Sequence, residues 1–182
     1  MTLCSILILS FVLNNYAQPE QEGSTSMNIT SSAFEDGKPI PTKYAYAGVE
    51  GGKNISLPFS WTGVPGNAKS LALSIVDPHP VAKNWVHWFV INIPPTATGF
   101  EEGASGTSMP KGSKELYNTY GTFGYGGPEP PPGSGVHPYV VTLYALHVDS
   151  LGLTDKTQLA MFQKALEGKI IATAKITGYF ER

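Results

Sequence analysis

The sequence has 182 residues, enough for a single domain that buries roughly 70% of the surface exposed by its unfolded chain. Its 12 basic and 14 acidic side chains give a net charge of -2, which excludes the strongly basic surface typical of nucleic-acid and anionic-membrane binders. With 20 Gly, 15 Pro and only 14% charged residues, the composition favours short strands joined by tight turns.

The first segment contains an apolar run from Leu3 to Leu13, shorter than the ~20 residues that a membrane-spanning helix needs. It fits the core of a signal peptide covering residues 1–17 and cleaved after Ala17, although no basic residue precedes it. Cleavage would remove Cys4, the only cysteine, and with it all disulfide and thiolate chemistry. We expect a periplasmic or secreted protein without stable membrane insertion. A buried first strand or helix, in a cytoplasmic protein, is the alternative.

A polar linker, residues 18–26, leads into one predicted domain, residues 27–182. Six segments of this domain are rich in β-branched and aromatic residues and are bounded by Gly, Pro or Asn, which predicts strands. These segments are Met27–Ser31, Ile55–Trp61, Ser70–Asp77, Trp85–Ile93, His137–Val148 and Ile170–Tyr179.

Three of these strands carry an ionisable side chain at the end of an apolar row. Alternation along a strand places Asp77 on the same face as Leu71, Leu73 and Ile75. In the next strand, His87 shares a face with Phe89, Ile91 and Ile93. In the third, His137 shares a face with Tyr139, Val141 and Leu143. The opposite faces are also largely apolar, which indicates interior strands covered on both sides. If the three strands are neighbours, their ionisable groups can converge on one cavity.

One helix is predicted near the carboxy terminus. Asp155 is placed to cap its first turn and Gly168 to end it. Between them, Leu159, Phe162 and Leu166 form one apolar stripe at helical spacing, as expected for a helix that packs on a sheet.

The loop Gly121–Gly135 has six glycines and four prolines in fifteen residues. A flexible linker does not need the prolines, and an extended spacer does not need the glycines. This mixture predicts an ordered loop that runs close to a ligand or to its own backbone.

The stretch DPHPVAKNWVHW, Asp77–Trp88, is compatible with several kinds of functional site. Asp77, His79, His87 and His137 are ligand types that zinc accepts, although the spacing of the two nearer histidines matches no recognised zinc motif. A hydrolase is a further alternative because Ser134 lies three residues before His137, but no GxSxG turn surrounds it.

Two long motifs resemble the phosphatidylethanolamine-binding protein family, also called Raf kinase inhibitor-like proteins, and its bacterial branch in particular. The first motif is Asp77-Pro78-His79-Pro80 followed by WVHW and an apolar strand that ends in NIPP. The second is GYGGPEPPPGSGVHPYVVTLYAL. SSAFEDGKPIPTKYA, SLPFSWTGVP and the ending ATAKITGYFER support the match, so the resemblance covers nearly everything from Met27 to Arg182.

The resemblance implies a mainly β fold, a sandwich or open barrel with one or two short C-terminal helices. It also implies a ligand cavity that binds a small anion or a phospholipid head group. By position, Asp77, His87, His137 and Tyr139 would line this cavity, and Pro78, Gly127 and Pro128 would shape its walls. The family implies a binding protein, not an enzyme, that uses no cofactor and regulates a kinase or a protease. The choice between monomer and homodimer stays open.

Two residues depart from the family pattern. His79 stands where the family usually has an acid, and Pro138 replaces an arginine. Because a proline cannot provide the bidentate contacts of a guanidinium, we expect the cavity to lose one permanent cation nearby, together with the carboxylate that His79 replaces. Anion binding would then be weak, would depend on His87 and His137, and would improve below about pH 6.5 as these histidines protonate.

Overall fold

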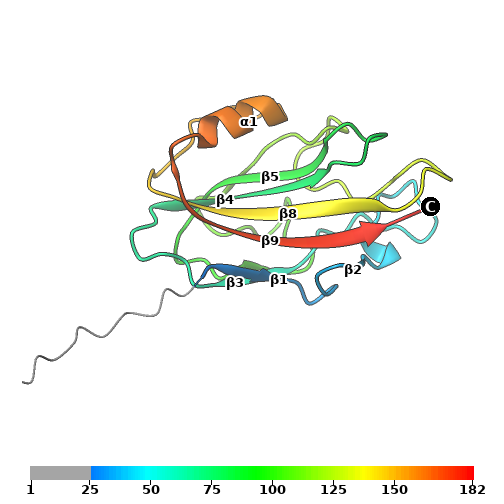
Figure 1. Ribbon diagram of the computed structural model, residues 1–182, viewed down its shortest axis with the longest axis horizontal. Helices are drawn as coiled ribbons and strands as arrows, with labels where there is room; N and C mark the ends of the chain where they lie inside the picture. The colour runs from blue at the N-terminus through cyan, green and yellow to red at the C-terminus, as the bar shows by residue number, and fades with distance from the viewer. Residues whose placement is uncertain (1–25) are drawn as a thin grey trace, which may run out of the picture.

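The computed structural model describes residues 26–182, and their regular structure is mainly β (Figure 1). The predicted signal peptide and all of the predicted linker except its last residue lie outside this range. The strands are β1 (Asn28–Thr30), β2 (Lys38–Pro39), β3 (Phe59–Thr62), β4 (Ser70–Asp77), β5 (Trp85–Ile93), β6 (Gly99–Phe100), β7 (Lys114–Glu115), β8 (His137–Leu146) and β9 (Ile170–Phe180). The helices are the 3-10 turn η1 (Thr42–Tyr44) and α1 (Leu159–Leu166). No helix within the described range is long and apolar enough to cross a membrane.

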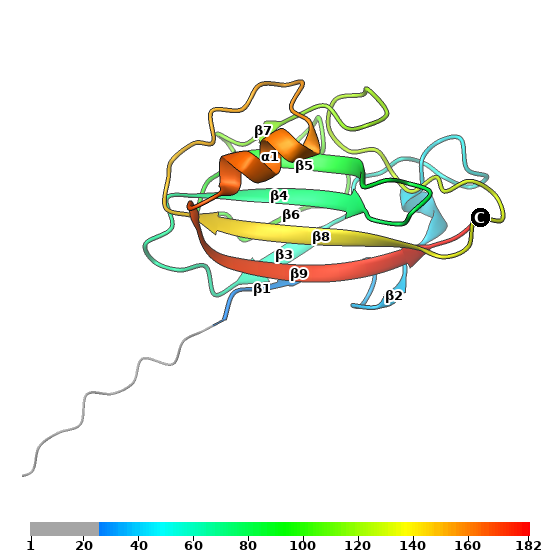
Figure 2. The ribbon, with the colours of Figure 1, turned by 45° about the horizontal axis from the view of Figure 1, so that its top comes forward.

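The strands form two open sheets and the helix forms a third layer. The large sheet has the order β2-β9-β8-β4-β5-β7, and the small sheet has the order β1-β3-β6. The small sheet faces β8 and β9 in Figure 1, and Figure 2 shows α1 lying over β5 on the other side. The predicted mainly β fold is confirmed, and of the one or two short helices expected near the carboxy terminus the described residues contain one, α1.

The large sheet is buried on both faces. Its inner face packs against the small sheet, where Leu73 of β4 and Val141 of β8 join Phe59 and Trp61 of β3 in one core. Its outer face packs under α1 through a second core that includes Phe162. Burial on both faces explains why β4 and β8 are almost continuously apolar, as expected for interior strands.

A β-bulge at His87 changes which face this residue occupies. β4 and β5 pair at Val76–Val86 and next at Ile75–Trp88, so His87 is an extra residue between two pairs. After it, Trp88 packs between the sheets and Phe89 packs under α1, and a second register shift further along returns Ile93 to the inner core. The expectation that His87 shares the face of Phe89 is therefore wrong. The bulge leaves His87 on the inner side, with Trp88.

The predicted strand bounds hold best for the interior strands. β4 and β5 have the predicted limits, and β1, β8 and β9 lie within one or two residues of theirs. The segment expected to form a strand from Ile55 begins only at Phe59, because Pro58 has no amide hydrogen to offer a neighbouring strand. The strands β2, β6 and β7 have two residues each, too few to show the alternation of apolar and polar residues from which a strand is predicted.

The helix begins later than predicted. Gln158 occupies the position before its first turn, and Asp155 lies in the preceding turn, where its carboxylate forms an ion pair with Lys114 at 2.7 Å. The expected cap at Asp155 is therefore wrong. Gly168, with φ of 69°, follows the helix as predicted, since this left-handed conformation is easiest for glycine.

Candidate functional site

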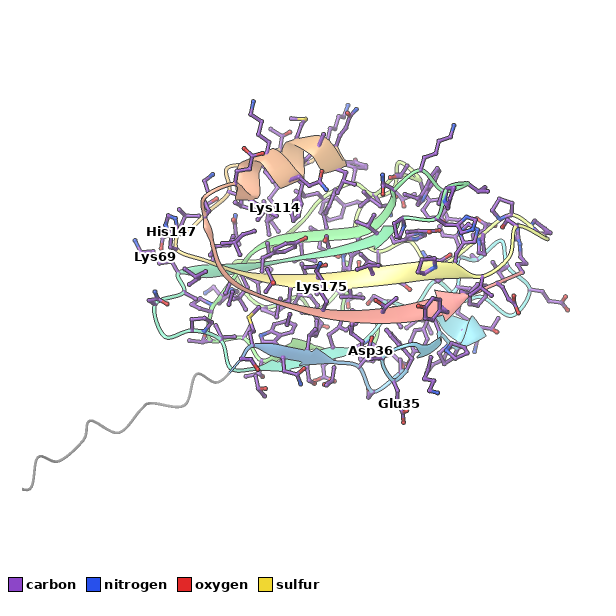
Figure 3. The ribbon with its side chains drawn as sticks, in the orientation of Figure 1. Glu35, Asp36, Lys69, Lys114, His147 and Lys175 are labelled. Carbon is purple, nitrogen blue, oxygen red and sulfur yellow. The ribbon has the colours of Figure 1, made fainter. Side chains whose placement is uncertain are left out.

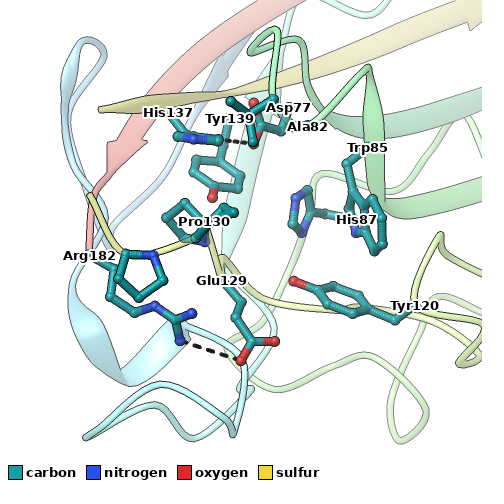
Figure 4. A pocket seen from close by; sticks show the side chains of 13 residues that line it. Asp77, Ala82, Trp85, His87, Tyr120, Glu129, Pro130, His137, Tyr139 and Arg182 are labelled. Atoms are coloured by element: carbon teal, nitrogen blue, oxygen red, sulfur yellow. Dashed lines mark hydrogen bonds and ion pairs between the residues drawn. The ribbon is translucent and has the colours of Figure 1, made fainter. Parts of the chain in front are cut away.

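A cavity of about 420 Å³ lies where β4 ends and where β5 and β8 begin. These neighbouring strands supply Asp77 from β4, Trp85 and His87 from β5, and His137 and Tyr139 from β8. Loop residues complete the wall: Val81, Ala82, Tyr120, Glu129, Pro130, Pro131, Pro132 and Arg182. Figure 4 shows these side chains surrounding one space. The four predicted central residues therefore meet in one cavity, and the neighbouring positions of β8, β4 and β5 explain why.

Asp77 and His137 form a buried pair at the back of the cavity. The His137 Nδ1–H donates to Asp77 Oδ2 at 2.6 Å, and both side chains are almost fully buried. The other carboxylate oxygen, Oδ1, accepts the backbone N–H of His79 at 2.8 Å. Because each oxygen of the carboxylate has a donor, Asp77 is held in one orientation at the end of β4.

Ser134 extends this pair toward the surface. Its hydroxyl lies 2.9 Å from His137 Nε2 and 2.6 Å from the carbonyl oxygen of Pro131. The one hydroxyl proton can be donated to the Pro131 oxygen or to His137 Nε2, and the Pro131 oxygen is the nearer of the two. The expected donation from His137 to a bound anion would require its hydrogen bond to Asp77 or to Ser134 to open.

His79 lies beside this network and does not form a metal site with it. Its ring stacks on that of His137, with centroids 3.8 Å apart, and its Nδ1 accepts the backbone N–H of Val81 at 3.3 Å. Within residues 26–182, no group of three or more His, Cys, Asp or Glu side chains is arranged to hold a metal ion. The geometry therefore gives no support to zinc binding by Asp77, His79, His87 and His137.

His87 is buried and uncharged at neutral pH. Its Nδ1–H donates to the carbonyl oxygen of Gly126 at 2.7 Å, and the backbone of Gly126 donates back to His87 at 2.8 Å. Burial lowers the pKa of His87 from 6.5 to about 4, more than the nearby carbonyl groups and Asp77 raise it. His87 therefore does not gain a proton near pH 6.5, contrary to expectation. At neutral pH its Nε2 presents a lone pair to a ligand.

Two tyrosines line the cavity with hydroxyl groups. Burial raises the pKa of both Tyr139 and Tyr120 far above the usual value, so both stay protonated. The Tyr120 hydroxyl donates to the carbonyl oxygen of Gly127 at 2.9 Å. Figure 4 shows the Tyr139 hydroxyl directed toward the space beside Pro130, where it can donate to a ligand.

Three residues predicted to shape the cavity walls lie behind or beside it. Gly127 and Pro128 are buried, and the Gly127 amide donates to Asn54 Oδ1 at 2.7 Å. A side chain at Gly127 would collide with the carbonyl oxygen of Tyr44, so this position needs glycine for close backbone approach. Pro78 is exposed and is not among the residues that line the cavity. The predicted ordered loop thus supports the site through its backbone.

Sequence reasoning did not single out Tyr120, Glu129 or Arg182. Arg182 reaches the cavity because β9 runs antiparallel to β8 and pairs Phe180 with His137. Its guanidinium Nη1 lies 3.6 Å from Glu129 Oε1 at the cavity wall. The cavity therefore lacks the cation that Pro138 replaces but has another, which comes from a different element. Only the register of β8 and β9 could have revealed it.

Comparisons with known proteins agree with this fold and site. A family model described as phosphatidylethanolamine-binding protein matches residues 30–181. The chain is 45% identical over 157 residues to a UPF0098 protein of Methanothermobacter thermautotrophicus, a match covering 86% of this chain and 99% of that one. It is 40% identical over 164 residues to a UPF0098 protein of Chlamydia trachomatis, with coverage of 86% and 99%. The crystal structure of Escherichia coli YbcL, described as a new member of the mammalian PEBP family, matches with a TM-score of 0.81 at 33% identity and covers 86% of this chain and 99% of that one.

Proposed function

The chain belongs to the phosphatidylethanolamine-binding protein family, and we propose that its cavity binds a small anionic or phosphorylated ligand such as a phospholipid head group. The observation that carries the proposal is the convergence of Asp77, His87, His137 and Tyr139 on one cavity of about 420 Å³. This volume suits a small ligand, and fixed polar groups in a largely apolar wall are typical of ligand sites.

The polar groups divide into donors and acceptors. At neutral pH the Tyr139 hydroxyl and the Arg182 guanidinium can donate to an anion, whereas uncharged His87 can accept from a protonated ligand oxygen or an amine. Asp77 and His137 satisfy each other and act mainly by holding the back of the cavity rigid. We therefore expect Tyr139 and Arg182 to contribute most of the direct anion contacts.

Isothermal titration calorimetry with inorganic phosphate and phosphoethanolamine at pH 7 tests this function. Tyr139→Phe removes only the hydroxyl and should weaken binding about tenfold, the effect of losing one hydrogen bond to a charged group. Tyr144→Phe is the matched control, since Tyr144 lies on the same strand but outside this cavity. Absence of heat with both ligands, or equal affinity in the two variants, would overturn the proposal.

A hydrolase is a second candidate because Asp77, His137 and Ser134 follow one another at hydrogen-bond distance, as the members of a catalytic triad do. The proton arrangement favours binding instead. The Ser134 hydroxyl has one proton, and the Pro131 carbonyl oxygen at 2.6 Å competes for it with His137 Nε2 at 2.9 Å. Hydrolysis of p-nitrophenyl acetate by the wild type that is lost in Ser134→Ala would support a hydrolase. Equal background rates of hydrolysis in the wild type and in Ser134→Ala would support binding alone.

We extend the proposal to regulation of a kinase or a protease, which only family membership supports. The test is the activity of a panel of serine proteases and protein kinases with and without the protein. No change across the panel would remove this extension and leave ligand binding intact. Light scattering during size-exclusion chromatography would show whether the protein acts as a monomer or as a homodimer.

We also propose that the protein acts in the periplasm or outside the cell, because the apolar run Leu3–Leu13 fits a signal peptide. Amino-terminal sequencing of the protein from its native cells is the test. A first residue at or near Gln18 would support export, and an intact amino terminus would contradict it.

A further inference from the structure

A second cavity, a groove of about 820 Å³, lies beside α1 on the outer side of the large sheet. Figure 2 shows α1 starting at the end of the sheet where β4 ends and β5 begins. The floor of the groove comes from Val86 and Phe89 of β5. Its walls come from the turn at Lys83–Asn84, the loop at Tyr117–Thr119 and the segment Lys156–Ala160 at the start of α1. None of these residues lines the ligand cavity, so this groove, which we call the α1 groove, is a separate site.

Hydrogen bonds hold the walls of the α1 groove in place. Thr119 is joined to β5 in both directions: its N–H donates to the Val86 carbonyl oxygen at 2.9 Å, and its hydroxyl accepts the Val86 N–H at 2.9 Å. The same loop is joined to the segment before α1, because the Tyr117 N–H donates to the Asp155 carbonyl oxygen at 2.9 Å. The groove is therefore formed before a partner binds, which reduces the entropy that binding costs.

The charged side chains that line the α1 groove are both positive. Lys83 and Lys156 are exposed, the lining includes no Asp or Glu, and the first turn of α1 holds no acidic residue. Within residues 26–182 neither lysine forms an ion pair, since the carboxylate of Asp155, the neighbour of Lys156 in the sequence, pairs with Lys114 at 2.7 Å. In a chain of net charge -2, the groove is therefore a local positive patch.

The turn that carries Lys83 has an unusual backbone conformation. Lys83 and Asn84 are consecutive residues with φ of 52° and 62°, in the left-handed region that is unfavourable for residues with a side chain. Such conformations gather at binding sites, where the surrounding structure holds them. Here the chain turns between Ala82, which lines the ligand cavity, and Lys83, which lines the α1 groove. The turn thus presents a lysine to the groove.

Apolar surface in the α1 groove is suited to a side chain and would be left unused by a small inorganic anion. Phe89 is buried in the floor and Leu159 is half-buried in the wall. At the rim, Tyr117 is 39% exposed, and its ring meets that of Phe123 edge to face with centroids 5.9 Å apart. Exposed aromatic side chains beside a groove are typical anchors of protein interfaces. Anionic membranes and DNA recruit clusters of about four to ten basic residues, whereas this groove has two.

We propose that the α1 groove docks an acidic segment of a partner protein. An apolar or aromatic side chain of the segment packs against Phe89, Leu159 and Tyr117, and its carboxylates lie beside Lys83 and Lys156. Two positive charges around an apolar floor match a segment in which Asp or Glu residues flank an apolar one. This docking does not depend on ligand binding in the other cavity, since the two sites share no lining residue.

Selection of random dodecapeptides from a display library on the immobilised protein tests the proposal. The selected peptides should combine Asp or Glu with an aromatic or aliphatic residue, and fluorescence anisotropy then gives the affinity of the tightest one. Lys83→Gln and Lys156→Gln should each weaken its binding about threefold, and the double variant about tenfold, as expected for exposed ion pairs. Tyr117→Ser should weaken it about tenfold, as loss of an aromatic anchor does. Lys164→Gln removes an exposed lysine of α1 that does not line the groove, so this matched control should bind as the wild type does.

Selection of no peptide, or of peptides without an excess of acidic residues, would overturn the proposal. So would an acidic peptide that binds the double lysine variant as tightly as the wild type. A peptide whose binding is abolished by Arg182→Gln and kept by the double lysine variant would lie in the ligand cavity instead, with the same consequence. Sedimentation with phosphatidylglycerol vesicles tests the other macromolecular occupant: wild-type binding that the double lysine variant loses would identify a membrane and contradict docking of a protein segment.

Discussion

Replacing His87 with asparagine should make the stability of the protein less sensitive to acid. His87 is 3% exposed, and burial lowers its pKa from 6.5 to about 4. Between these two values the unfolded chain binds a proton that the folded protein does not, so stability decreases as the pH falls. Asparagine does not titrate in this range, and its side-chain amide can still donate to the carbonyl oxygen of Gly126.

The size of the effect follows from the two pKa values. Linkage predicts that His87 lowers the free energy of unfolding of the wild type by about 2 kcal/mol between pH 7 and pH 5, and by about 3 kcal/mol between pH 7 and pH 4. The loss is largely complete at the lower pH, because the folded protein then also begins to bind the proton. His87→Asn should show a pH dependence that is shallower by these amounts.

Urea unfolding at several pH values from 7 to 4 measures the difference. His147→Asn is the matched control, since His147 follows the other end of β8, as Figure 3 shows, and is exposed. This control should keep the slope of the wild type. If wild type and His87→Asn lose stability in parallel, to within about 0.5 kcal/mol, His87 is not the buried neutral group described here.

Two further substitutions test the packing that supports the cavity. Gly127→Ala should lower the free energy of unfolding by about 2 kcal/mol or more, because the added methyl group would overlap neighbouring backbone. Gly66→Ala is the control: its methyl group would meet nothing within 4 Å, so the free energy of unfolding should change by less than about 0.5 kcal/mol. Glu115→Gln should cost about 2 kcal/mol, because the buried carboxylate accepts the Trp88 Nε1–H at 2.7 Å and two other donors, and an amide would turn a donor toward one of them. The exposed Glu101→Gln should be neutral in the same unfolding assay, and equal effects of Glu115→Gln and Glu101→Gln would contradict this account.

The interior of the large sheet could be predicted from the sequence because its strands carry strong local patterns. Asp77, His137 and Tyr139 lie on the predicted faces of β4 and β8, whose alternation is regular up to the cavity. The face of His87 could not be predicted, because a bulge arises from the pairing of two strands and leaves little trace in either one. His87 lies on the same side as Trp85, which also lines the cavity, and the bulge separates it from the face of Phe89.

The charges of the cavity could be predicted only in part. Arg182 and His137 are 45 positions apart in the sequence numbering, and only the register of β9 against β8 brings them together. The substitution at Pro138 indicated that a cation was missing, although another element supplies one. Glu129 lies in a loop whose composition predicted order, but the composition did not indicate which side chain the backbone would direct into the cavity.

The most direct test of ligand binding at this site is the NMR spectrum of the histidine rings during a titration with phosphoethanolamine. The signals of His87 and His137 should shift and saturate together, because both line the cavity, while those of His147 at the far end of β8 should stay in place. Saturable shifts confined to His147, or no shift of any ring at millimolar ligand, would contradict binding in this cavity.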